Sequence, residues 1–115
     1  MIQKKLNSIL LGIFKKHGLN TAHAKICCKA LINAELVGAP SHGLARLMMY
    51  CKRIQKKLIN PKPKIKVKKI SHSISFVHAN NSIGFVAANI GIKQVIKNAK
   101  KTGIGLVGIK NSGHY

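Results

Sequence analysis

Acidic residues are almost absent from this sequence, which has 21 Lys and Arg but a single acidic residue, Glu35. The formal net charge of +20 would attract polyanions such as nucleic acids, acidic lipids and nucleotides. Two features disfavour a nucleic-acid-binding protein. The lysines are scattered along the chain, and only two basic residues are Arg, the residue best suited to bidentate phosphate contacts. Lys, Ile and Asn all have A/T-rich codons, so a biased genome explains much of the charge.

The sequence also lacks the cysteine patterns of disulfide frameworks and zinc sites. Three cysteines, two of them adjacent (Cys27 and Cys28), do not make a disulfide framework. No Cys-x-x-Cys motif is present, so we predict no metal site. A reducing, cytoplasmic location fits best. An apparent signal-peptide pattern near the N-terminus is interrupted by Lys15 and Lys16. No apolar run approaches the roughly 18 residues that span a membrane, so we expect no membrane association.

Helical periodicity dominates the first 60 residues, which we predict to form an N-terminal helical segment. Apolar residues recur at helical spacing over residues 6–14. Asn20 is the predicted N-cap of a second helix that ends near Gly38. Ser41 is the predicted N-cap of a third helix, whose apolar stripe runs over residues 44–58.

Residues 61–115 have a mixed pattern, which predicts the start of an αβ domain. Strand-like sequence covers residues 65–70 and 73–76, and Asn80-Asn81 reads as a turn. A fourth helix and a short strand over residues 104–109 follow. The residues expected on the buried face of that helix are Phe85, Ala88, Ile92, Val95, Ile96 and Ala99.

The six residues from Gly103 to Gly108 match the G-x-G-x-x-G pattern of dinucleotide-binding loops. That loop must follow a strand and open a helix, whereas this one follows a predicted helix and lies within a predicted strand. We therefore interpret its glycines as a helix stop and sites of close packing. The element order predicts an α/β fold with α+β character, in which N-terminal helices precede a small sheet with a crossover helix, and not a Rossmann fold.

The segment around Ser41, His42 and Arg46 carries the first candidate chemistry. If Ser41 caps a helix, His42 lies in its first turn, where the helix dipole favours a neutral imidazole. Arg46 would lie one turn along the same face. An Arg can bind a carboxylate bidentately while a His exchanges a proton with an adjacent oxygen. Taken alone, however, a His at a helix start is more often structural.

His114 is the second candidate, within the segment Asn111-Ser112-Gly113-His114-Tyr115. It follows a predicted strand end, where α/β folds usually place functional residues. The alternative interpretation of His114 alone is an exposed loop histidine near a chain end.

Three stretches together resemble one known family. They are Ala34–Gly43 with Arg46 and Tyr50, then Asn80–Gly84 with the helix after it, and then Gly103–His114. In this order and spacing they resemble the type-2 malate/L-lactate dehydrogenases, which include ureidoglycolate, sulfolactate and diketogulonate-type members. The resemblance runs along essentially the whole chain.

The resemblance implies an oxidoreductase that transfers a hydride between NAD or NADP and C2 of a small 2-oxo or 2-hydroxy acid. It implies that His42 and His114 are the acid/base candidates and lie near the cofactor, and it leaves open which of them moves the proton. It implies that Arg46 binds the substrate carboxylate and that Ser41 helps to orient the site. It also implies a homodimer.

Chains of this family are much longer, and the body of their cofactor-binding segment would follow Tyr115. We therefore expect an N-terminal fragment: a truncated gene, part of an eroding gene, or half of a split enzyme whose C-terminal half is a separate chain. Two other functions stay open. One is a basic nucleic-acid-binding module, supported by charge alone. The other is a non-catalytic remnant that serves as a packing or dimerisation element.

Overall fold

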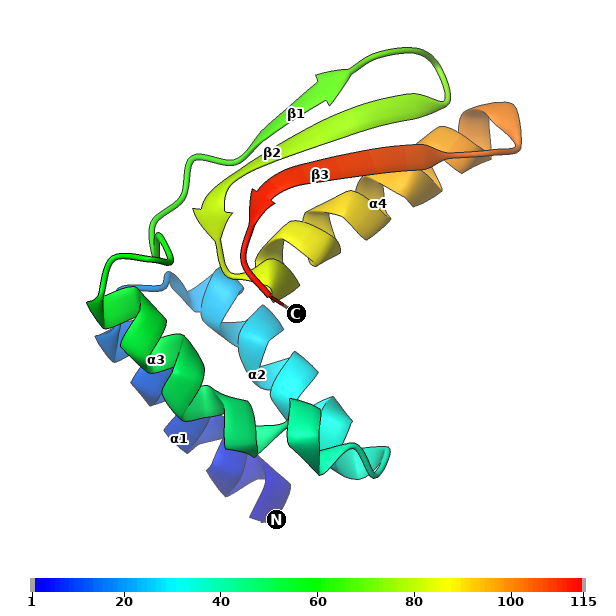
Figure 1. Cartoon of the computed structure of the whole chain (residues 1–115). Coiled ribbons are helices and arrows are strands. Elements are labelled where there is room, and N and C mark those ends of the chain that lie inside the picture. The colour runs from blue at the N-terminus through cyan, green and yellow to red at the C-terminus, as the bar shows by residue number, and fades with distance from the viewer. Residues whose placement is uncertain (1, 115) are drawn as a thin grey trace. The chain divides into compact units, whose positions relative to one another are not determined.

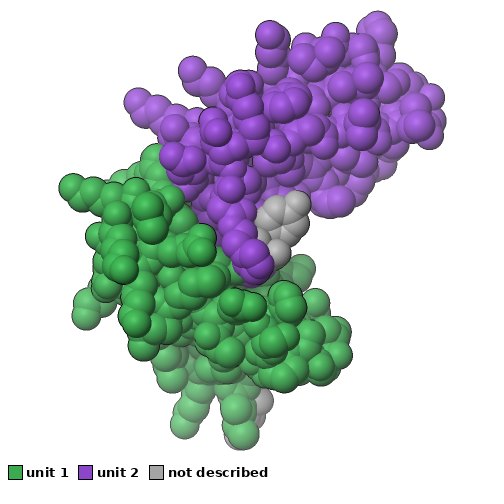
Figure 2. Space-filling model, in the orientation of Figure 1, with its two compact units in different colours: residues 1–62 green, residues 63–115 purple. Residues whose placement is uncertain are grey.

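The chain folds into two compact units, Met1–Lys62 and Pro63–Tyr115 (Figure 2). The computed structural model describes residues 2–114. These residues have the mixed α/β fold that the sequence predicts. Unit 1 contains α1 (Ile2–Lys16), α2 (Thr21–Leu36), two short 3₁₀ turns, η1 (Pro40–His42) and η2 (Leu44–Arg46), and α3 (Leu47–Gln55). Unit 2 contains β1 (Lys66–Lys69), β2 (Ile74–Ser82), α4 (Gly84–Thr102) and β3 (Leu106–Ser112).

The first two helices of unit 1 pack as their periodicity predicts. Asn20 caps α2, because its side-chain oxygen accepts a hydrogen bond of 2.8 Å from the His23 N–H. Of the apolar residues that recur at helical spacing over residues 6–14, Leu10 and Phe14 are buried, whereas Ile9 is 60% exposed and does not belong to the buried face. The residues that fill the core of this helix pair are Leu10, Phe14, Ala24, Cys27, Cys28, Leu31 and Ile32.

The third helix differs from the prediction at both ends. Ser41 does not cap it: α3 begins at Leu47, and no side chain caps it. The reason is Gly43, whose backbone (φ −100°, ψ −132°) lies outside the helical region and separates η1 from η2. At the other end the chain leaves the helix after Gln55, and Lys57 adopts a positive φ of 60°. Leu58, expected on the apolar stripe, is 64% exposed as a result.

Unit 2 is a three-stranded sheet in the order β1-β2-β3, with α4 along one face (Figure 1). β1 and β2 are antiparallel, whereas β2 and β3 are parallel, with α4 as the crossover between them. Ser75, Val77 and Ala79 alternate along β2 and are fully buried. Successive side chains of a strand point to opposite faces, so this set lies on the face that α4 covers.

Asn80 and Asn81 do not form the predicted turn. Both lie inside β2 with left-handed backbone angles, φ 53° and 58°, and the pairing with β3 is irregular between His78 and Ser82. This pattern is that of a β-bulge, for which Asn is suited because it tolerates left-handed angles. The strand therefore continues past the residues that the sequence assigns to a turn.

The predicted buried face of α4 is also wrong in part. Ile92 and Ile96 are 58% and 49% exposed, and small residues face the sheet instead. A Cβ on Gly91 would lie 2.8 Å from Ile109 Cδ1, so the helix approaches β3 closely at this glycine. The buried residues of α4 are Gly84, Val86, Ala87, Gly91 and Asn98.

The glycines from Gly103 to Gly108 serve the structural roles that the sequence predicts. Gly103 ends α4 in the left-handed conformation (φ 85°), with its N–H bonded to Ala99 O at 2.7 Å. A Cβ on Gly105 would meet the backbone carbonyl of Val95. A Cβ on Gly108 would lie 2.7 Å from the Phe76 ring. These glycines are thus occupied by packing within unit 2.

Across residues 2–114, none of the helices combines the length and apolar character needed to cross a bilayer.

Candidate functional site

A compact cluster in unit 1 joins Ser41, His42 and Arg46. The Ser41 hydroxyl and His42 Nδ1 are hydrogen-bonded at 2.9 Å. The Arg46 Nε donates a bond of 2.8 Å to the Ser41 carbonyl oxygen. Ser41 and His42 are exposed and Arg46 is half-buried, so the cluster is open to a ligand. The structure therefore brings together three of the four predicted site residues.

The local backbone structure that brings these residues together differs from the prediction. His42 lies at the end of a 3₁₀ turn, and four residues separate it from the start of α3, so it is not in the first turn of an α-helix. The helix-dipole argument for a neutral His42 imidazole therefore lacks its basis. Arg46 is positioned by its bond to the Ser41 carbonyl, and not by the spacing of an α-helical face.

Glu35, at the end of α2, holds this loop in place. Its Oε1 accepts a hydrogen bond of 2.8 Å from the Leu44 N–H. The carboxylate also lies against Gly43, where a Cβ would come within 2.8 Å of Glu35 Cδ. Gly43 is buried beneath it, so a residue with a side chain does not fit there. The only acidic side chain of the protein thus clamps the turn between His42 and Arg46.

One feature of the sequence points to a role for Glu35: it is a single acidic residue among 21 basic ones. Its partner is a backbone N–H nine residues away, and no side-chain pattern reveals such a pair in advance.

Tyr50, which the resemblance includes, is a core residue. Its side chain is 1% exposed. Burial raises the pKa of its phenol, with Arg46 acting in the opposite direction. Tyr50 therefore belongs to the core of unit 1, as one of the buried residues of α3.

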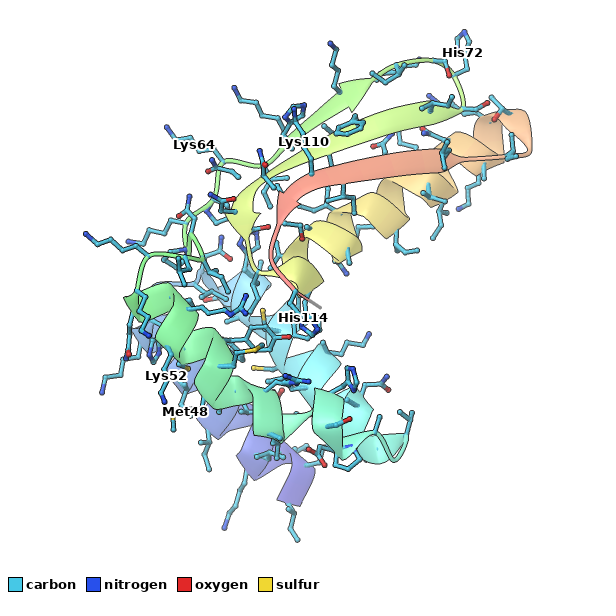
Figure 3. All side chains as sticks on the ribbon, viewed as in Figure 1. Met48, Lys52, Lys64, His72, Lys110 and His114 are labelled. Atoms are coloured by element: carbon cyan, nitrogen blue, oxygen red, sulfur yellow. The ribbon has the colours of Figure 1, made fainter. Side chains whose placement is uncertain are left out.

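His114 belongs to unit 2 and follows β3 (Figure 3). It is exposed. The segment that carries it is tied to the end of β2, because the Gly113 N–H donates to Ser82 O at 2.9 Å. His114 therefore stands at the carboxyl ends of the parallel pair β2 and β3, the place where open α/β sheets bind ligands. The neighbouring residue of the motif, Tyr115, lies outside the described residues.

The thiols are poor candidates for chemistry. Cys27, Cys28 and Cys51 are buried and unpaired. Burial, with a smaller contribution from Cys28, raises the pKa of Cys27 to about 12. A thiol that stays protonated is a weak nucleophile. Within residues 2–114, no group of His, Cys, Asp and Glu side chains is arranged to hold a metal ion.

The chain is similar to known dehydrogenases along its whole length. The sequence model of the malate/L-lactate dehydrogenase family matches residues 2–115. A malate/(S)-sulfolactate dehydrogenase of Methanothermus fervidus is 34% identical over 94% of this chain. The NAD(+)-dependent ureidoglycolate dehydrogenase of Escherichia coli K12 is 35% identical over 97% of it.

The fold agrees with the same relatives. The structure of malate dehydrogenase from Pyrococcus horikoshii superposes with a TM-score of 0.94 at 35% identity, over 98% of this chain. The sulfolactate dehydrogenase of Methanocaldococcus jannaschii gives a TM-score of 0.94 at 30% identity. The chain spans about a third of the length of these relatives, 32% of the first and 33% of the second.

Proposed function

Because the chain belongs to the malate/L-lactate dehydrogenase family, we propose that it supplies the substrate-binding part of an NAD- or NADP-dependent 2-hydroxy acid dehydrogenase. The overall reaction converts a 2-oxo acid, a reduced nicotinamide and a proton into a 2-hydroxy acid and the oxidised nicotinamide. The observation that carries the proposal is the clamped loop, in which Arg46 and His42 are held around Ser41.

Arg46 would bind the substrate carboxylate. Its Nε is engaged by the Ser41 carbonyl, and within residues 2–114 its Nη1 makes a long contact of 4.0 Å with Met49 Sδ. The terminal nitrogens are therefore available for a charge-assisted bond to an anion. The bond at Nε fixes the plane of the guanidinium, so less side-chain entropy is lost on binding.

His42 and His114 are the two candidates for proton transfer to the substrate oxygen. The bond to Ser41 engages His42 Nδ1, and this leaves Nε2 to face a ligand. Ser41 then acts as a positioning residue that fixes the imidazole ring. For His114, the support is its place beyond the parallel strand ends.

The described residues include one sequence pattern of dinucleotide-binding loops, from Gly103 to Gly108. Their glycine-rich stretch is used in packing against α4 and β2, so it does not form a phosphate-binding loop. We infer that the residues that hold the cofactor come from the part of the family's chain that this sequence does not cover.

The experiment that tests the function supplies that part in trans. NADH and NADPH oxidation is measured with a panel of 2-oxo acids, for the 115-residue chain alone and mixed with the remaining segment of the Pyrococcus horikoshii enzyme. We expect turnover only in the mixture.

In that mixture, His42→Asn and His114→Asn identify the proton donor, since its loss removes one limb of the kcat–pH profile. An inactive mixture that nevertheless forms a stable complex would contradict the proposal.

Arg46→Gln is expected to weaken binding of malate by roughly 10- to 100-fold, because one charge-assisted contact to the carboxylate is lost. The measurement is a calorimetric or NMR titration of the chain with malate. The matched control is Arg53→Gln, which removes the same charge from an exposed position of α3. Equal losses in both variants would mean that Arg46 acts only through the overall charge.

A further inference from the structure

A basic groove lies on unit 2, between β1 and α4, away from any residue assigned a role above. Its volume is about 350 Å³. The two elements, together with β2 and the turn between β1 and β2, supply its lining. The lining residues are Val67, Lys69, His72, Ser75, Gln94, Lys97, Asn98 and Lys101.

The fold brings these side chains together from three places. Lys69 pairs with Ser75 in the antiparallel register of β1 and β2, so it lies on the face of the sheet that α4 covers. Residues three, four and seven positions apart share one face of a helix, which places Lys97 and Lys101 side by side along α4. His72 lies in the turn that joins the two strands (Figure 3).

The floor of the groove is a fixed polar network. Asn98 is 5% exposed and Ser75 is fully buried. The Asn98 amide donates to Ser75 Oγ at 3.0 Å and to Ser73 O at 3.3 Å. Its oxygen accepts from the Gln94 amide at 3.0 Å. A buried network whose members are all bonded is rigid, so the walls keep their spacing without a ligand.

Unit 2 has no acidic side chain of its own. The single acidic side chain of the protein, Glu35, belongs to unit 1 and is bonded to its own loop. Three lysines and a histidine therefore line one small concavity of a unit that has no acidic side chain. Like charges held together repel, and an anion placed between them relieves that repulsion.

We propose that this groove binds a phosphate dianion, either free or as the phosphate group of a small metabolite. Lysine is a common phosphate ligand that acts as a point charge, and three lysines suit a doubly charged, compact anion. The small volume of the groove, about 350 Å³, favours a small molecule over the extended backbone of a nucleic acid. The proposal stands apart from the dehydrogenase function and uses none of its residues.

The test compares two triple variants of the full chain that carry the same charge change. The groove variant is Lys69→Gln, Lys97→Gln and Lys101→Gln. The control is Lys66→Gln, Lys68→Gln and Lys110→Gln, three exposed lysines of the same sheet that do not line the groove. Lys68 pairs with Phe76 and so faces the opposite side of the sheet.

Inorganic phosphate is titrated into each protein at constant ionic strength, and binding is followed by NMR shifts of unit 2. We expect saturable binding that the groove variant weakens by at least about tenfold and the control by less than about twofold. Equal weakening in both variants, or no saturation in the unmodified chain, would overturn the proposal. A single-stranded oligonucleotide that binds where phosphate does not would overturn it too, and would assign the charge to nucleic acid. NADPH added in a parallel titration shows whether a cofactor phosphate is the source.

Discussion

Gly105→Ala is expected to lower the free energy of unfolding by about 2–3 kcal/mol, the upper range for forcing an extra carbon into a packed site. The added Cβ would meet backbone atoms of α4: the Val95 carbonyl, and the Ala99 nitrogen at 3.2 Å. Backbone cannot move aside as a flexible side chain can. The chain between α4 and β3 would therefore have to separate from the helix. Urea denaturation followed by circular dichroism measures the loss.

Gly12→Ala is the matched control for this substitution. Gly12 lies within α1 and has no atom within 4 Å of an added Cβ. Alanine there is expected to raise the free energy of unfolding by about 0.5–1 kcal/mol, because glycine is entropically costly inside a helix. Equal effects of the two substitutions would show that α4 does not approach Gly105 as closely as the structure has it.

Glu35→Ala is expected to lower the free energy of unfolding by about 1.5–3 kcal/mol, the usual range for a hydrogen bond to a charged group. The substitution removes the acceptor of the Leu44 N–H, a bond of 2.8 Å that is partly buried. It also opens the space above Gly43. The loop that carries His42 and Arg46 should loosen with it, so malate affinity should fall together with stability.

Glu35→Gln separates the clamp from the charge. The amide keeps an oxygen that can accept from the Leu44 N–H, so we expect it to retain more than half of the stability that alanine loses. Calorimetry of the two variants gives the comparison. If glutamine is as damaging as alanine, the negative charge of Glu35, and not its hydrogen bond, stabilises the loop.

The sequence predicts those features of the fold that depend on residues close together in the chain. It does not predict those that depend on contacts between distant segments. Asn20 caps α2 through a neighbour three residues away, and Gly103 ends α4 through its own backbone angle, so both were predictable. The buried face of α4 was not, because it is set by the approach of Gly91 to Ile109. Periodicity alone selects the large apolar residues Ile92 and Ile96, whereas the contact with β3 selects small ones.

The candidate site likewise depends partly on local sequence and partly on a contact from a distant segment. The residue types and their order indicated Ser41, His42 and Arg46 as partners, and the structure joins them by two hydrogen bonds of 2.9 Å and 2.8 Å. The capped helix assigned to them was wrong, since the pattern Pro40 to Gly43 is compatible with both a helix start and a 3₁₀ turn. Glu35, which accepts the hydrogen bond of the Leu44 N–H just after this turn, belongs to another helix, α2.

The use of the only acidic side chain as a clamp also bears on how the protein responds to salt. A net charge far from zero destabilises a compact chain through self-repulsion, and salt screens that repulsion. The chain has 21 basic residues and one acidic side chain, whose bond goes to the backbone N–H of Leu44, so screening removes far more repulsion than attraction. Added salt should therefore stabilise this chain, whereas the partly buried bond of Glu35, and with it the loop that presents His42 and Arg46, is screened much less.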